Sequence, residues 1–345
     1  MHHARSALSE ADLPPLADVL AETRVVALPM VTRFRGITVR EALLTRGPRG
    51  WTEFSPFFEY DDEEAAAWLA AALDFGWGED PEILRDSIPV NATVPSVAAA
   101  DVAAVLARYP GCRTAKVKVA EPGQQLADDI ARVAAVRDVL GPEGRIRVDA
   151  NALWNVDEAE HAIHALAPYD LEYVEQPCPT VEDLAEVRRR VKYMGIPVAA
   201  DESVRKASDP LAVARAGAAD VLIVKAQPLG GIRSALEITA LAGLPVVVSS
   251  AIDTSVGLAM GAMLAAAVPR LDYDCGLGTA ALLRADVTRE PLTPVDGAIP
   301  VRRVDVDEAL LAEHAADADR RDWWLARLER TYRVLESRAA SGRGA

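Results

Sequence analysis

Three acidic residues that lie far apart in the sequence each follow a short apolar run directly: Asp149 in RVDAN, Glu175 in VEQP and Asp201 in ADES. Carboxylates brought close together repel one another unless a cation lies between them. Magnesium suits such a set, because it is a hard cation that prefers oxygen ligands and keeps positions open for water or a substrate carboxylate. We therefore predict that the three acids bind Mg²⁺, with Mn²⁺ as a substitute. Each acid taken alone would also fit a helix cap or a surface ion pair.

Lysines occupy comparable positions. Lys116 and Lys118 are separated by one residue, and the two-residue period of a β-strand places both amines on one face. Two ammonium groups at this spacing repel, so each is expected to lower the pKa of the other toward the range in which a neutral amine acts as a base. Lys225 ends another apolar run, VLIVK, and its place in the order of runs puts it across the site from Lys118. We predict that Lys118 and Lys225 are catalytic and address the two faces of a planar enediolate; solvated or structural lysines are the alternative.

Further polar residues lie beside these acids and lysines. Arg147 comes two residues before Asp149 and shares its face, so it could orient that acid or a substrate group, and a structural ion pair is the equal alternative. Residues next to a metal ligand often orient it through hydrogen bonds. The predicted substrate-binding or ligand-orienting residues are Lys116, Arg147, Asn151, Gln176, Glu202, Ser249 and Ser250.

The predicted site residues follow apolar, β-rich runs that recur along the chain from residue 88, each followed by a stretch with helical spacing. Parallel strands joined by crossover helices explain this alternation, and eight such strands can close into a barrel. An open doubly wound sheet is the alternative, but the chain lacks a GxGxxG motif after the first run. The predicted strands are 88–94, 115–119, 146–149, 173–175, 196–200, 221–225, 245–249 and 271–274, and the predicted helices include 126–140, 156–166, 181–194 and 231–242.

The predicted fold is therefore α/β, a modified TIM barrel of the (β/α)7β type over residues 88–284. Side chains at the carboxyl ends of barrel strands meet at one mouth, which is where the predicted site residues fall. Residues 1–87 are predicted to form an α+β domain that caps the barrel, and the tail, 285–345, is predicted to return to it. The elements expected there are strands at 23–29, 37–45 and 51–54 and helices at 61–75 and 318–338.

The composition of the chain limits the kinds of molecule that it is expected to bind. The formal net charge of −15 and the pI near 4.9 argue against nucleic acid, because phosphate binding needs clustered Lys and Arg. The longest nearly apolar run, 256–269, is too short to span a bilayer, and the first twenty residues lack the pattern of a secretory signal. We expect a cytoplasmic protein that acts on a small carboxylate without membrane contact, and the oligomeric state is left open. Cys112, Cys178 and Cys275 form no CxxC pair and are expected to be buried thiols.

The combined motifs resemble the enolase superfamily, specifically its muconate-lactonising branch: KxK on the second strand, Asp, Glu and Asp on the third to fifth, and Lys on the sixth. Within that branch, FRGITVREALL, WTEFSPFFEY, SSAIDTSVG, RVDAN, VEQPC and ADES are most similar to the o-succinylbenzoate synthase family of the actinobacterial type. The first two segments look like the family's capping-domain pieces that close over the substrate. Thr52 departs from the related WxEFSPF pattern, which usually has Gly there, and this difference is expected to alter a turn without affecting the catalytic set.

The resemblance implies a lyase of menaquinone biosynthesis that dehydrates a cyclohexadiene carboxylate, bearing a hydroxyl and a succinyl chain, to o-succinylbenzoate. By this likeness Lys118 would remove the α-proton and then protonate the hydroxyl that leaves from the same face. Magnesium on Asp149, Glu175 and Asp201 would stabilise the enediolate, and Lys225 would face its other side as a cation. The turn at 274–279 would help to recognise the side groups of the substrate.

Two other functions fit parts of the pattern. An N-succinylamino acid racemase or another epimerase of the superfamily needs the same metal and both lysines, as opposed acid and base. Epimerases of this branch typically place a DxD pair on the eighth strand; Asp272 and Asp274 lie slightly early for it and are predicted to be structural. A barrel that only binds a carboxylate or a metal would leave Lys118 and Lys225 unexplained.

Overall fold

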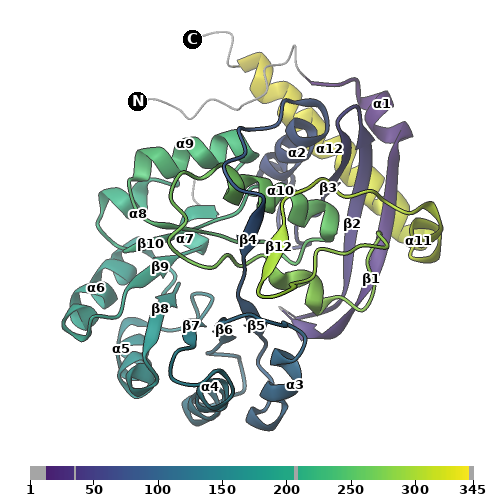
Figure 1. The fold of residues 1–345 in the computed structure, drawn as a ribbon. Helices are drawn as coiled ribbons and strands as arrows, with labels where there is room; N and C mark the ends of the chain where they lie inside the picture. The colour runs from purple at the N-terminus through teal and green to yellow at the C-terminus, as the bar shows by residue number, and fades with distance from the viewer. Residues whose placement is uncertain (1–12, 35, 206–208, 342–345) are drawn as a thin grey trace.

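The computed structural model describes residues 13–34, 36–205 and 209–341, so the predicted absence of a secretory signal falls partly outside the described residues. At the centre is a parallel sheet of seven strands in the order β11-β10-β9-β8-β7-β6-β5, each beside its neighbours in sequence (Figure 1). This order arises when successive connections cross over in the same right-handed sense. The strands are β5 (Ala92–Val94), β6 (Thr114–Lys118), β7 (Arg145–Asp149), β8 (Leu171–Glu175), β9 (Val198–Ala200), β10 (Val221–Val224) and β11 (Val246–Val248).

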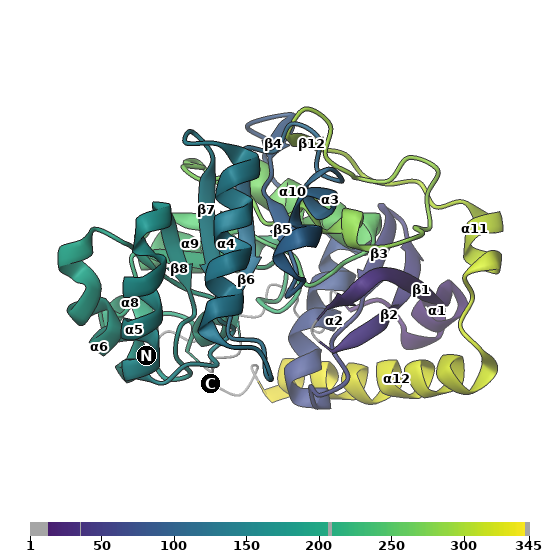
Figure 2. The same cartoon turned by 90° about the horizontal axis from the view of Figure 1, so that it is seen from below.

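Helices α4, α5 and α6 pack along the outside of the sheet (Figure 2). Local signals define where several of them begin: the Asn155 side chain accepts from the backbone N–H of Glu158 at the start of α5, and Thr180 caps α6 in the same way. The four predicted crossover helices are confirmed, two of them with the expected bounds. The helices are α3 (Val102–Leu106), α4 (Leu126–Leu140), α5 (Val156–Leu166), α6 (Val181–Val191), α7 (Glu202–Arg205), α8 (Ala212–Arg215), α9 (Ile232–Ala242) and α10 (Ser255–Ala267).

The barrel closes differently from the prediction. No strand forms at 271–274; two single bridges, Val90 with Cys275 and Ser249 with Gly276, join the two sides of the sheet instead. The backbone passes Ser249 so closely that a Cβ on Gly276 would lie 2.4 Å from the Ser249 Oγ. Only glycine permits this approach, and contacts of one residue each leave no strand pattern in the sequence.

The predicted strand at 88–94 is divided in two. β4 (Ser87–Pro89) pairs antiparallel with β12 (Ala298–Pro300) from the tail, and only β5 joins the barrel. The sequence gave no sign of this change of partner, because buried apolar residues continue from Ile88 through Val94.

A smaller antiparallel sheet, coloured purple in Figure 1, lies beside the barrel, and the tail returns to it. Helix α12 packs against α2, which itself packs on the sheet. The predicted elements of the capping domain are all present, whereas the boundaries after 87 and 284 stay predictions. The elements are α1 (Leu16–Ala21), β1 (Thr23–Phe34), β2 (Ile37–Gly47), β3 (Gly50–Phe54), α2 (Asp62–Trp77), α11 (Glu308–Glu313) and α12 (Ala318–Ser341).

Thr52, which was expected to alter a turn, lies within β3 and pairs with Thr45 of β2. Its hydroxyl donates to the carbonyl of Ala72 at 2.8 Å, and a Cβ on Gly76 of α2 would lie 3.1 Å from its methyl group. The expectation of a changed turn is therefore wrong, and Thr52 fills the interface between β3 and α2.

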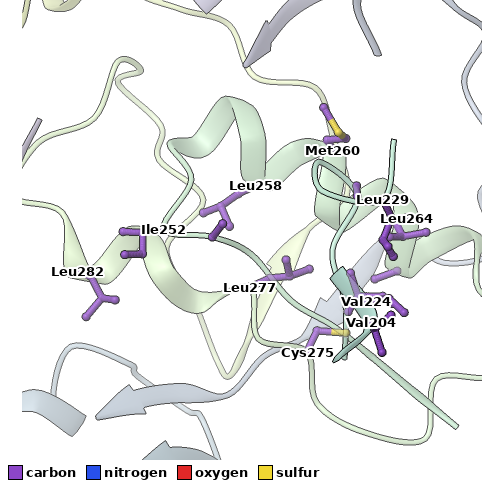
Figure 3. Close-up of a cluster of buried hydrophobic side chains, with 14 of the residues drawn as sticks. Val204, Val224, Leu229, Ile252, Leu258, Met260, Leu264, Cys275, Leu277 and Leu282 are labelled. Carbon is purple, nitrogen blue, oxygen red and sulfur yellow. The ribbon is translucent and has the colours of Figure 1, made fainter. Parts of the chain in front are cut away.

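Two hydrophobic cores support the fold. The larger lies between sheet and helices, where Leu258 and Leu264 of α10 gather with Val224 of β10 (Figure 3). The smaller core lies inside the barrel. Most of its residues come two positions before a predicted site residue at the end of the same strand, so their side chains point inward as that residue does. We call this second set the barrel floor; it consists of Tyr173, Ala199, Val221, Ile223 and Val247, with Tyr273 packed against it.

Within the described ranges, none of the helices combines the length and the apolar character needed to cross a lipid bilayer.

Candidate active site

The carboxyl ends of β6, β7 and β8 are in register, and this register brings lysines and acids together. Lys118 pairs with Asp149, and Asp149 pairs with Glu175. Lys118 Nζ lies 2.5 Å from Asp149 Oδ2, while Lys116 Nζ lies 2.8 Å from the same oxygen and 2.7 Å from Glu175 Oε1. All four side chains are buried. Their inward direction follows from the two-residue period of the strands above the barrel floor.

Asp201 and Lys225 form a second group at the ends of β9 and β10. Lys225 Nζ lies 2.7 and 2.6 Å from the two carboxylate oxygens of Asp201. Arg205 Nε donates to Asp201 Oδ1 at 3.2 Å, and its Nη1 reaches the hydroxyl of Tyr60 beside α2. The five residues predicted as catalytic or metal-binding thus lie at one end of the barrel.

The pKa values of the three lysines are shifted in different directions. Burial lowers the pKa of Lys118, aided by repulsion from Lys116 and opposed by attraction to Asp149. Burial also lowers the pKa of Lys225, although Asp201 opposes it. Burial alone would lower the pKa of Lys116, but Asp149 and Glu175 outweigh it and hold that pKa well above the usual value. The expectation that both lysines of the KxK pair are lowered is therefore wrong for Lys116, because its ammonium bridges two carboxylates.

The acids differ as well. Burial opposes ionisation of Asp149, but Lys116 and Lys118 hold its pKa well below the usual value, and Lys225 does the same for Asp201. Burial and the nearby Asp149 raise the pKa of Glu175 to about 8.

Glu175 also carries the observation that fits a metal. Its Oε2 is buried without a hydrogen-bond partner, which is costly for a carboxylate oxygen. Across the described ranges no three His, Cys, Asp or Glu side chains come close enough to form a metal cluster, since lysine ammonium groups lie between the acids. The donor set, three carboxylates of which one has an unused buried oxygen, suits a hard divalent cation.

Comparison with known proteins bears on this arrangement. Residues 98–305 match the family model described as enolase C-terminal domain-like, and residues 25–76 match the one described as enolase N-terminal domain-like. An o-succinylbenzoate synthase of Thermobifida fusca is 58% identical over 308 residues, which cover 88% of this chain and 94% of the relative. One from Mycobacterium tuberculosis strain H37Rv is 55% identical over 324 residues, covering 94% and 97%. The chain belongs to the o-succinylbenzoate synthase family of the enolase superfamily.

Solved structures agree on the fold. A muconate lactonizing enzyme from Pseudomonas fluorescens superposes with a TM-score of 0.73 at 22% identity, covering 86% of this chain and 98% of the other. The L-Ala-D/L-Glu epimerase from Bacillus subtilis gives 0.70 at 23% identity, covering 83% and 96%. These similarities concern the barrel and its capping sheet, whereas the closer relatives define the family.

The residues predicted beside the acids are tied to them or to the loops that carry them. Asn151 Oδ1 accepts from Lys118 Nζ at 2.5 Å, and its Nδ2 donates to Glu202 Oε1 at 3.2 Å. Gln176 Oε1 accepts from the backbone N–H of Asp201 at 2.9 Å. These contacts support an orienting role for Asn151, Gln176 and Glu202.

Arg147 lies two residues before Asp149 on β7, and its side chain contacts the segment that carries the acidic pair near residue 273. Arg147 donates to Glu172 Oε2 at 2.5 Å and to the carbonyl of Asp274 at 2.7 Å. Asp274 also accepts from Arg145, and Asp272 pairs with the exposed Arg270. The contacts favour the structural ion pair for Arg147 and the structural role expected for Asp272 and Asp274.

A small cavity, partly open to solvent, adjoins the lysines and acids. Ser249 and Ser250 line it as expected, and Thr279 accompanies them. The lining residues that sequence reasoning missed are Thr93, Ala251 and Ile252, whereas Gly276 lies in the predicted turn at 274–279 and Phe34 in the predicted capping segment.

Thr93 and Phe34 illustrate what a sequence can reveal. Thr93 lies one residue before the end of β5 and could have been found, because strand ends define the mouth. Phe34 belongs to the capping sheet and lies with its ring centroid 5.4 Å from Lys118 Nζ. It begins the FRGITVREALL segment, which only the family resemblance, and no local pattern, predicted to close over the substrate.

Proposed function

We propose that this chain is an o-succinylbenzoate synthase that carries out the Mg²⁺-dependent syn-dehydration of a hydroxy-succinyl-cyclohexadiene carboxylate in menaquinone biosynthesis. The observation that carries the proposal is the meeting of Lys118 and Lys225, two buried lysines with lowered pKa, at one cavity with Asp149 and Asp201. The identity to named o-succinylbenzoate synthases over most of the chain gives the substrate class.

Lys118 acts first as a base in this proposal. Its lowered pKa favours the neutral amine that can accept the α-proton of the substrate. The ammonium so formed then donates the same proton to the hydroxyl as its C–O bond breaks, so water leaves and the ring becomes aromatic. Asp149 and Asn151 hold the amine in position through their hydrogen bonds to Nζ.

Lys225 lies on the other side of the cavity in this proposal and offsets the negative charge that develops after proton removal. Its ammonium is held by both oxygens of Asp201. This pairing keeps a cation at the site although burial lowers the pKa of the lysine.

Enzymes of this family depend on a divalent metal ion. We assign its binding to Asp149, Glu175 and Asp201, where Mg²⁺ would supply positive charge that stabilises the substrate carboxylate during proton removal. The unused Oε2 of Glu175 supports this assignment.

Dehydration of the purified full-length chain, followed by the appearance of the aromatic product, tests the proposal. Activity should need Mg²⁺, disappear with a chelator and return when the metal is restored. Lys118→Ala should abolish it, whereas Lys192→Ala, which removes an exposed lysine on the outside of the barrel, should not. Product formation that survives chelation or Lys118→Ala would contradict the mechanism.

Two buried lysines with lowered pKa also suit proton transfer between opposite faces of a substrate, so N-succinylamino acid racemisation is the second candidate. Incubation with an N-succinylamino acid in heavy water distinguishes the two. Deuterium at the α-carbon without dehydration activity would favour the racemase.

A further inference from the structure

Ile252 has a backbone conformation that β-branched residues rarely adopt. It lies between β11 and α10 with φ of +62°, and its side chain is buried in the wall of the cavity. A β-branched residue in the left-handed region is strained and persists only where surrounding contacts impose it. The contacts that impose this conformation therefore shape the substrate site.

Arg40 of β2 makes one of these contacts. Its Nε donates to the carbonyl of Ile252 at 3.0 Å, and its Nη2 donates to the carbonyl and hydroxyl of Ser55 at 2.5 and 2.8 Å. The guanidinium also lies 4.8 Å from the ring centroid of Phe57. Its side chain is buried, and the rigid fork of an arginine fixes the direction of each donor.

Glu53 of β3 holds the other end of the same segment. Its Oε2 accepts from Thr254 Oγ1 at 2.6 Å and from the backbone N–H groups of Thr254 and Gly257 at 3.1 and 3.0 Å, so it caps the N-terminus of α10. Its Oε1 accepts from Ser55 Oγ at 2.6 Å. A Cβ at position 257 would lie 2.8 Å from Glu53 Oε2, so the carboxylate reaches the helix only because residue 257 is glycine.

The two charged groups depend on each other. Glu53 and Asp253 are both buried acids whose pKa is raised by burial, and Arg40 offsets both. Removing Arg40 would leave two buried acids without their guanidinium and release the Ile252 carbonyl at the same time.

We propose that Arg40 and Glu53 are positioning residues for the dehydration: from the capping sheet they hold Ile252 and Thr254, and thereby set the wall of the substrate cavity without touching the reacting atoms. This inference rests on the proposed function for its substrate. It makes substrate affinity depend on two interdomain contacts that link residues more than 200 positions apart in sequence.

The first test compares Arg40→Met with Arg320→Met in the Mg²⁺-loaded full chain. Arg320 pairs with Glu41 of β2 and lies over the rings of Phe58 and Trp323, so its loss is a control from the same capping domain. We expect Arg40→Met to raise KM, and the Kd for o-succinylbenzoate, by about 10-fold or more, with kcat changed by no more than about threefold. Arg40→Lys and Glu53→Gln should give smaller increases in KM, and Arg320→Met none.

A second test addresses the backbone of residue 252. Glycine adopts a positive φ freely and alanine does not, so Arg40→Met should raise KM less in an Ile252→Gly background than in an Ile252→Ala background. The factor by which Arg40→Met raises KM should differ between the two backgrounds by at least about threefold. Equal factors would show that Arg40 does not act through the backbone conformation of residue 252.

A third readout needs no ligand. Glu53 protects the amides of Thr254 and Gly257, so hydrogen exchange in a peptide spanning 249–257 should rise in Arg40→Met and Glu53→Gln but not in Arg320→Met. Unchanged exchange and unchanged KM in folded Arg40→Lys and Glu53→Gln would overturn the inference. If the wild-type chain binds no substrate, the proposed function fails, whereas exchange still decides whether Arg40 and Glu53 hold the segment.

Discussion

The barrel contains two layers of charged side chains, one toward each end of the same strands. The upper layer, at the carboxyl ends, pairs lysines with acids and borders the cavity. The lower layer lies nearer the amino ends and pairs arginines with acids; its buried Arg147 is in register with Tyr173 of the barrel floor, whereas Arg145 is exposed. It consists of Arg145, Arg147, Glu172 and Asp274, with Thr114 hydrogen-bonded to Asp274.

The type of cation separates the two layers. Arg147 stacks over Tyr173 with its guanidinium 4.8 Å from the ring centroid and keeps its proton at any ordinary pH. Lys118 is a single ammonium whose pKa burial lowers, and it faces a cavity. We therefore expect a titratable cation beside open space, rather than buried charge alone, to mark the catalytic site in this barrel.

The largest expected effect comes from exchanging these cations. Lys118→Arg keeps the positive charge but cannot act as a base, so kcat for dehydration should fall by about 10³-fold or more. Steady-state kinetics with saturating Mg²⁺ measures this. If Lys118→Arg kept even a tenth of the wild-type kcat, the proposed difference in function between the two layers would be wrong.

The reverse exchange should affect stability instead. Arg147→Lys keeps the charge but loses the fork that reaches Glu172 and the Asp274 carbonyl, so the free energy of unfolding should fall by about 3 kcal/mol. Urea unfolding measures the loss, and kcat should stay within about threefold of the wild type. A large drop in kcat for the folded variant would assign Arg147 to the reaction.

Glu53 sharpens the comparison, because it is a buried acid outside both layers. Its folded pKa of about 7 lies above the ordinary 4.5, with Asp253 adding to the effect of burial and Arg40 opposing it. The folded state therefore holds this proton more tightly; the stabilisation is full below pH 4.5 and is lost as the pH rises through 7. Relative to Glu53→Gln, the wild type should lose roughly 3 kcal/mol of stability over this window. Unfolding at pH 4.5 and pH 8 tests this, and parallel curves for the two proteins would refute it.

The smallest effect is expected at the edge of the upper layer. Asn151→Ala removes one hydrogen bond to Lys118 and one to Glu202 but no charge, so kcat should fall by about 10-fold. The pH dependence of kcat/KM provides a second readout, since Asn151 helps to hold the Lys118 amine. An unchanged kcat would show that Asp149 positions the Lys118 amine without help from Asn151.

Much of this arrangement could be predicted from the sequence, because several site residues are each marked by a local sequence pattern. Asp149, Glu175 and Lys225 each end an apolar run, and strand ends meet at one mouth whatever the details of packing. The crossover helices were predicted closely because their apolar spacing and caps are local.

The rest depends on contacts between distant segments. Closure through Cys275 and Gly276 involves single bridges, which have no periodicity to detect. The contacts of Arg40 with Ile252 and of Glu53 with Thr254 cross from one sheet to the other. The high pKa of Lys116 likewise depends on two acids that only the folded register brings to it.

The barrel floor has a consequence for how the reaction cycle proceeds. Because Tyr173, Ile223 and Val247 fill the cylinder beneath the lysines, the pocket is closed on that side, while Phe34 of the capping sheet lines it as well. We expect substrate, product and the released water molecule to use the same opening. The product should therefore compete with incoming substrate, and turnover should become limited by departure once chemistry is fast.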